Sequence, residues 1–260
     1  PPYLFAYLLT VILFCCRNTP ITLSFFMNKS IWELLFLQGG GLSVGLVVGP
    51  GWFCGTLVLA SFVIYFLLGK SKQTYLYFIA PLSFVLIFSF ILQKTGNLNH
   101  WDYIGTLRGF TELGLGCICF QICAALKDRL QGKRKLLSSI IEVLSIAYLI
   151  YVMTLVGPSE GDFSCVLVIA VLIISLFIGN SYFSRFMNKT VFSYLGKISM
   201  GIYLNHIAIS YVKWDSLFPV PWNWSLMAYL VFTVLFSCVS TALVDESVNR
   251  VRARCGDPMK

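Results

Sequence analysis

The sequence predicts an all-α, polytopic membrane protein: a helix bundle of about eight transmembrane helices with a cytoplasmic C-terminus. Hydrophobic residues make up 58% of the chain and charged residues only 12%, about half of the charged share of soluble domains. Apolar runs near the length that crosses a bilayer recur along the whole chain. A soluble protein of this size would instead show amphipathic periodicity.

The apolar runs place the expected helices at residues 2–16, 51–69, 74–92, 104–126, 136–156, 163–180, 191–211 and 224–244. With a cytoplasmic C-terminus, thirteen Lys and Arg residues lie in cytoplasmic segments and four (Arg17, Lys29, Lys94 and Lys213) on the other side. This positive-inside bias supports the orientation. It also explains the net charge of +8, which favours anionic membrane lipid. No nucleic-acid partner is expected, because no basic run is interleaved with aromatic residues.

The first run, residues 2–16, is barely long enough to cross a membrane. The chain begins PPYLFAYLL, without an initiator Met or a charged leader, so we expect an N-terminally truncated protein that lacks upstream spans. The alternative is a short tilted helix in an intact processed protein. In the outer segment that follows, IWELLFLQ (31–38) is expected to form an interfacial helix with Glu33 facing water. The glycine-rich residues 39–51 suit a re-entrant or closely packed backbone.

Arg108 and Glu112 are candidate site residues in the expected helix 104–126. They are four residues apart on one helix face, so an ion pair within the helix is possible. One hypothesis is that they face a central cavity and hold a polar substrate or a catalytic partner. The other is a structural pair that fixes a helix–helix contact. Gly105, Gly109 and Gly116 form a different strip that suits close helix packing.

Three other features bear on the site. The polar loop 93–103 is expected to form a rim for a substrate. Glu142, near the cytoplasmic end of the helix 136–156, is expected to pair with neighbouring lysines. Eight of the nine cysteines lie in apolar runs, Cys117, Cys119 and Cys123 lack C-x-x-C spacing, and the chain has two histidines. No metal site is therefore expected.

The expected helix 191–211 carries an unusual set of polar residues. Ser199, Tyr203 and His206 fall at i, i+4 and i+7, which is one helix face. Polar groups at membrane depth are costly unless they face a bundle interior or an aqueous cavity. We therefore expect these three residues to line the same cavity as Arg108 and Glu112.

His206 and Lys197 each have two alternative roles. His206 could transfer a proton, because histidine is the usual acid–base group near neutral pH, or it could only form a hydrogen bond between helices. Lys197 lies near the cytoplasmic end of its helix. It is either an interfacial anchor or, on the donor side, a contact for an anionic donor.

Four segments resemble acyltransferase family 3, the integral-membrane O-acyltransferases, in the same order along the chain. FSYLGKISMGIYLNH (192–206) is similar to the family's late "LGKISYSIYLxH" signature. PPYLFAYLL resembles the span after its basic R-x-x-R-x-x-P segment. ELLFLQ (33–38) with GPGWFCGTLVLASFVIYFLL (49–68) resembles its "ELLLLQ … WFLSALLLA" stretch, and LRGFTELGLG (107–116) its "R-x-x-x-E/F-x-x-G" span. The chain departs from the pattern at Met200, Asn205 and Val248, where Tyr, Trp and Pro are common.

The resemblance implies what the complete protein would do. Residues 1–249 would form a single membrane acyltransferase-like domain lacking the first two of ten spans, and residues 250–260 a short basic cytoplasmic tail. The enzyme, an O-acetyltransferase by expectation, would move an acyl group from cytoplasmic acyl-CoA to a hydroxyl of an extracytoplasmic or cell-surface carbohydrate. It would lie in the plasma or inner membrane, with acetyl-CoA as co-substrate and no bound cofactor.

The resemblance also implies that the catalytic arginine and histidine belong to the first span, upstream of Pro1. The present chain alone is then expected to be inactive. Two other hypotheses remain open. The chain could be a non-enzymatic carrier or exporter of a small polar or lipid-linked molecule, which also explains intramembrane charges. It could also be a membrane module attached to another enzyme domain, as in membrane serine racemases.

Overall fold

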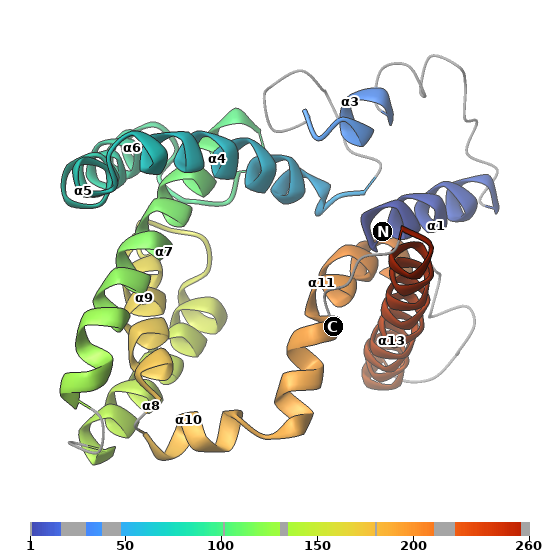
Figure 1. The fold of residues 1–260 in the computed structure, drawn as a ribbon. Coiled ribbons are helices and arrows are strands. Elements are labelled where there is room, and N and C mark those ends of the chain that lie inside the picture. The colour runs from blue at the N-terminus through green and yellow to red at the C-terminus, as the bar shows by residue number, and fades with distance from the viewer. Residues whose placement is uncertain are drawn as a thin grey trace. The chain divides into compact units, whose positions relative to one another are not determined.

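The computed structural model describes residues 2–16, 30–37, 48–100, 102–130, 135–179, 181–210 and 222–255. Within these ranges every regular element is a helix and no strand occurs (Figure 1). Five helical stretches are long and apolar enough to cross a membrane: Gly51–Lys70, Lys72–Thr95, Tyr103–Lys127, Lys135–Val156 and Trp224–Arg250. The chain is an all-α membrane protein, and the fold class predicted from the sequence is confirmed.

The other three expected spans are helical but differ from those five. α1 (Pro2–Cys16) and α9 (Asp162–Ile178) have 15 and 17 residues, fewer than the roughly 20 of a typical crossing. α11 (Thr190–Ser210) has 21 residues, but its Lys, Asn and His side chains lower its mean hydropathy. In the described part of the chain, helices thus lie at all eight expected places.

The chain divides into two compact units, which are described separately. Unit 1 comprises Pro1–Leu35, Ser43–Gly51 and Val191–Lys260. Unit 2 comprises Phe36–Leu42 and Trp52–Thr190. Unit 1 therefore combines the first and last parts of the chain, whereas most of unit 2 is one continuous stretch.

Unit 2 is built from α4 (Gly51–Lys70), α5 (Lys72–Thr74), η3 (Tyr75–Ile79), α6 (Ala80–Thr95), α7 (Tyr103–Leu130), α8 (Lys135–Tyr151), η4 (Val152–Val156), α9 and α10 (Tyr182–Met187). α7 packs against α6 and α9, and α8 packs against α9 (Figure 1). Rings of Phe84, Phe88 and Phe163 form an aromatic cluster with centroids 4.6 to 5.5 Å apart. Ile104 and Leu115 of α7 pack on this cluster, so it joins the three helices α6, α7 and α9.

Two π-helical turns, η3 and η4, interrupt the long helices. Pro81 follows η3, and a proline lacks the N–H that would bond the carbonyl four residues earlier and clashes with that carbonyl. The wider π-turn accommodates this residue. In η4 the N–H of Gly157 donates to the carbonyl of Val152 at 3.0 Å, five residues back. Gly157 has a φ of 70°, a conformation that favours glycine and ends the helix.

The glycine strip expected on α7 is present at two of its three positions. A side chain at Gly109 would collide with Thr56 of α4, and one at Gly105 would collide with the carbonyl of His100. Thr56 is fully buried and its hydroxyl lies 3.2 Å from that of Thr106. The expectation was wrong for Gly116, which faces open space in unit 2.

This difference gives a matched prediction. We expect Gly109→Ala to destabilise unit 2 by about 1–3 kcal/mol, because the added methyl group overpacks the contact between α4 and α7. Gly116→Ala should be neutral or stabilising by up to about 1 kcal/mol, because alanine is the better helix former. Thermal unfolding of the purified protein in detergent measures both changes. Equal effects of the two substitutions would contradict this account of the packing.

Unit 1 contains α1, α3 (Ile31–Leu34), α11 and α13 (Trp222–Cys255). α1 packs against α13, where the rings of Phe5 and Phe236 lie 5.4 Å apart. The buried residues of α1 are Tyr3, Ala6, Tyr7 and Thr10, which form a single helix face. α13 continues to Cys255, beyond the expected end at residue 244, because no Gly or Pro interrupts it earlier and Glu246 pairs with Arg250 at 2.5 Å one turn later.

Candidate functional site

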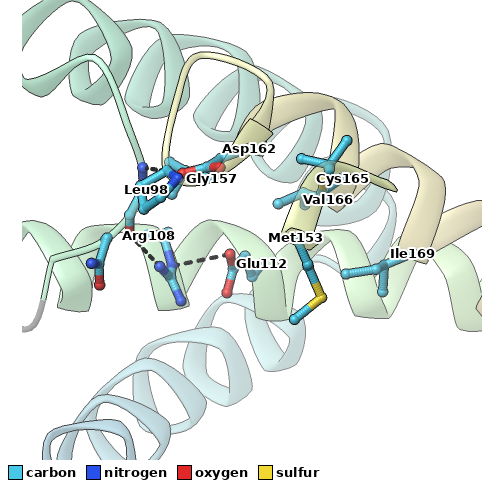
Figure 2. A pocket seen from close by; sticks show the side chains of 12 residues that line it. Leu98, Arg108, Glu112, Met153, Gly157, Asp162, Cys165, Val166 and Ile169 are labelled. Atoms are coloured by element: carbon cyan, nitrogen blue, oxygen red, sulfur yellow. Dashed lines mark hydrogen bonds and ion pairs between the residues drawn. The ribbon is translucent and has the colours of Figure 1, made fainter. Parts of the chain in front are cut away.

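A pocket of about 410 Å³ lies in unit 2 where α7, η4 and the start of α9 meet (Figure 2). It is lined by Leu98, Asn99, Arg108, Glu112, Val152, Met153, Gly157, Pro158, Asp162, Cys165, Val166 and Ile169. Leu98 and Asn99 come from the polar loop 93–103, which was expected to form a rim. A volume of this size falls within the range of small-molecule sites.

Arg108 and Glu112 form the charged part of this pocket. The Nε of Arg108 lies 3.1 Å from Oε1 of Glu112, so the ion pair predicted from the i, i+4 spacing is confirmed (Figure 2). The two side chains are 23% and 29% exposed. Arg108 also donates from Nη1 to the carbonyl of Leu98 and lies over the ring of Trp52, 5.6 Å from its centroid. The guanidinium is therefore held by an acid, a loop carbonyl and an aromatic face at once.

Asp162 joins the two loops that border the pocket. Its Oδ2 accepts a hydrogen bond from the N–H of Leu98 at 2.9 Å, and its Oδ1 accepts one from the N–H of Ser159 at 3.4 Å. Asp162 lies in the first turn of α9, where a carboxylate is favoured by the helix dipole. The loop before α7 and the loop before α9 are thereby fixed to each other.

The remaining predicted site residues lie on α11, in unit 1. Ser199 is exposed and its hydroxyl donates to the carbonyl of Gly196 at 2.8 Å. Tyr203 and His206 are half-buried, and their rings lie 6.0 Å apart. Lys197 pairs with Asp245 of α13 at 2.6 Å, with side chains 58% and 43% exposed. The structure thus places Arg108 and Glu112 in one unit and the α11 residues in the other.

One nitrogen of the His206 ring has a hydrogen-bond partner in the same helix. Nδ1 lies 2.6 Å from the carbonyl oxygen of Tyr203. A carbonyl can only accept a hydrogen bond, so Nδ1 is the donor in this contact and Nε2 takes no part in it. The backbone carbonyl of His206 accepts a hydrogen bond from the hydroxyl of Tyr229 at 3.1 Å, which connects this turn of α11 to α13.

Asn205, which was not among the predicted site residues, is a fully buried polar residue of α11. Its Nδ2 donates to the hydroxyls of Ser237 and Ser240 at 3.5 and 3.2 Å. The buried face of α11 contains Gly201, Leu204 and Ala208 as well. A sequence signal existed, because α13 repeats hydroxyl side chains at spacings that give one helix face, and such groups form hydrogen bonds between membrane helices.

A match to a family model shows the family of this chain. The model of acyltransferase family 3, described as an acyltransferase domain, matches residues 1–242. The chain belongs to acyltransferase family 3. The resemblance recognised from the sequence motifs is confirmed. Searches of curated proteins and of solved structures give no match.

The family match covers both units, because residues 1–242 include α1 through most of α13. This acyltransferase domain is a membrane domain, as its five long apolar helices indicate. Among the residues that the structure describes, no three His, Cys, Asp or Glu side chains gather as metal ligands would.

Glu33 of this acyltransferase does not face water, so that expectation was wrong. It is completely buried, and its Oε1 accepts a hydrogen bond from the N–H of Val48 at 2.8 Å. A side chain at Gly51 would come within 3.0 Å of both Glu33 Oε1 and the hydroxyl of Tyr3. The close packing expected of the glycine-rich segment therefore occurs around this carboxylate. The hydroxyl of Tyr7 is buried close by.

Glu142 also differs from its expected role. It was expected to pair with neighbouring lysines, but it is completely buried and its Oε1 accepts a hydrogen bond from the hydroxyl of Ser175 at 2.8 Å. Ser175 belongs to α9, so the contact joins α8 to α9. An exposed lysine one or two turns away cannot reach a carboxylate that faces a neighbouring helix.

Proposed function

We propose that this chain is the membrane part of an O-acyltransferase that moves an acyl group, an acetyl group in the simplest case, from cytoplasmic acyl-CoA to a hydroxyl of an extracytoplasmic carbohydrate. The family match supports acyl transfer. The observation that carries the rest is the pocket in which Arg108 and Glu112 meet the loops before α7 and α9. The plasma or inner membrane is the proposed location.

The position of the pocket along the helices supports the carbohydrate acceptor. The start of α7, the residues that directly follow η4 and the start of α9 all contribute to it. In the orientation that the positive-inside bias favours, these three ends lie on the extracytoplasmic side. An acceptor sugar approaching from that side would meet the charged rim first.

The proposed reaction requires a base and a group that stabilises negative charge. The acceptor hydroxyl attacks the thioester carbonyl, a C–O bond forms, the C–S bond breaks, and the hydroxyl proton must pass to a base and then to the leaving thiolate. A guanidinium can stabilise the developing negative charge on the carbonyl oxygen. Within the described residues, Nε2 of His206 lies outside the contact that Nδ1 makes and is the candidate acceptor for proton transfer.

Radiolabelled acetyl-CoA tests this function with membranes that contain the full-length protein. We expect label to appear on carbohydrate when acetyl-CoA is supplied to the cytoplasmic face and not when it is supplied to the outer face. Flux of a small molecule without acetyl-CoA and without covalent change would support the carrier alternative instead. No labelled product from either face would overturn the proposal.

His206→Ala in the same assay addresses its role. If Nε2 takes part in proton transfer, the rate should fall by about 10²–10⁴-fold, whereas loss of a single substrate contact should cost about tenfold. Arg185→Ala is the control, because Arg185 is an exposed cation of α10. An unchanged rate for His206→Ala would remove His206 from the site.

A further inference from the structure

The pocket in unit 2 has two chemically different sides. Asn99, Arg108, Glu112 and Asp162 form a polar rim, and apolar side chains from η4 and α9 form most of the rest. Figure 2 shows Arg108 and Glu112 on one side of the pocket and Met153, Val166 and Ile169 toward the other. A ligand that fits both sides has a polar head and an apolar chain.

The charges of the rim indicate whether the polar head of the ligand is charged or neutral. Two carboxylates, those of Glu112 and Asp162, accompany one guanidinium, so the rim carries one net negative charge. The guanidinium is already paired with Glu112, bonded to the Leu98 carbonyl and placed over Trp52. Tight phosphate recognition normally uses free guanidinium or ammonium groups. A phosphate or other anionic head is therefore disfavoured.

A neutral, hydroxyl-bearing head fits the same rim. Carboxylate oxygens accept hydrogen bonds from hydroxyl groups, and an amide both donates and accepts. In the described part of unit 2, the contacts of Glu112 involve Oε1, which leaves Oε2 to accept a hydroxyl. The side chain of Asn99 is exposed at the rim. Sugar hydroxyls supply both kinds of partner.

The apolar side leads out of the pocket along η4 and α9. The π-turn of η4 places Val152 and Met153 in the lining, and π-turns often occur at functional sites. Met153 is 79% exposed and Ile169 is 42% exposed, so this wall is continuous with the apolar outer surface of unit 2. A chain bound there would extend into hydrocarbon rather than fold into a closed cavity.

We infer that the ligand of this pocket is a neutral, lipid-linked sugar: a glycosyl head at Arg108, Glu112 and Asn99 with an alkyl chain along Met153 and Ile169. The inference deepens the proposed function, on which it rests for the assignment of the pocket to the acceptor. It specifies a membrane-anchored acceptor in place of a soluble saccharide.

Photolabelling tests this inference without turnover. The probe is an octyl β-glucoside with a diazirine in its alkyl chain, used below its micellar concentration on the full-length protein in lipid nanodiscs. We expect label on the peptides of η4 and α9. Unmodified octyl glucoside should compete, whereas glucose, octyl phosphate and acetyl-CoA should compete at least about tenfold less well.

Two substitutions on α9 provide a matched comparison. Ile169→Trp fills the apolar wall and should lower labelling about tenfold, whereas Val171→Trp should leave it unchanged, because Val171 is similarly exposed but does not line the pocket. Met153→Trp at the highly exposed mouth gives a second test if Ile169→Trp unfolds the protein in a thermal melt.

Several outcomes would overturn the inference. Equal competition by octyl phosphate would indicate an anionic head, equal competition by glucose a soluble sugar, and equal competition by acetyl-CoA the acyl donor. Uniform labelling of every helix would indicate ordinary partitioning into lipid. Acetyl transfer to a soluble sugar without site-specific label would reject this inference and keep the proposed function. Specific label without any acyl transfer would reject the proposed function and keep the lipid-linked sugar as the ligand of the pocket.

Discussion

Replacement of Arg108 by alanine is expected to lower acyl transfer by at least about 100-fold, which corresponds to a loss of about 2.7 kcal/mol. The substitution removes the ion pair with Glu112, the hydrogen bond to the Leu98 carbonyl and the contact with Trp52. It also leaves the carboxylate of Glu112 without its cation. Acetyl transfer from labelled acetyl-CoA and thermal unfolding, measured on the same preparations, give the two results to compare.

A double variant separates the two hypotheses for this pair. Arg108→Ala/Glu112→Ala removes both charges, so no unpaired charge remains in the pocket. If the pair only fixes a helix contact, both stability and transfer should recover relative to Arg108→Ala. If the pair holds substrate, stability should recover and transfer should not. Recovery of transfer in the double variant would exclude a direct role for Arg108.

Arg108→Lys sharpens the comparison. Lysine keeps the positive charge but lacks the planar fork that contacts Glu112 and Leu98 together. We expect Arg108→Lys to retain most of the stability and little of the transfer activity. Full activity would show that a single positive charge is sufficient.

Replacement of Glu33 by alanine is expected to cause the largest loss of stability in unit 1, about 2–4 kcal/mol. The buried N–H of Val48 would lose its acceptor, and the space beside Gly51 and Tyr3 would become a cavity. Glu33→Gln keeps an acceptor oxygen and should cost about half as much or less. Thermal unfolding measures the loss, and hydrogen exchange at the Val48 amide measures its local cause.

Glu246→Ala is the matched control for Glu33→Ala. Glu246 is an exposed carboxylate of the same unit, with a side chain 58% exposed, and surface ion pairs contribute little. A Val48 amide that exchanges at the same rate in Glu33→Ala and Glu246→Ala would contradict the structural role assigned to Glu33.

The accuracy of the sequence predictions depended on how far apart the interacting residues lie in the chain. Arg108 and Glu112 are one helical turn apart, so the period of the helix alone predicted their contact. Glu33 and Val48 are in contact although they lie 15 residues apart in the sequence. No local pattern predicts a contact at that separation, and a carboxylate before an apolar run was therefore expected at the surface.

Contacts between helices were the other source of error. The sequence showed that Glu142 needs a polar partner, but not that α9 would supply it through Ser175. On α11, the polar stripe of Ser199, Tyr203 and His206 was visible, whereas the face that packs on α13 is the one with Asn205. Helical periodicity defines faces, and the neighbouring helix decides which face is buried.

The division of the chain has a consequence for biosynthesis. Because residues 52–190 form most of unit 2 without interruption, the ribosome delivers all of its helices before α13 is made. During that interval Phe5 of α1 has no Phe236 to pack against. A nascent chain arrested after α11 should therefore hold all the helices of unit 2, whereas α1 still lacks its contact with α13.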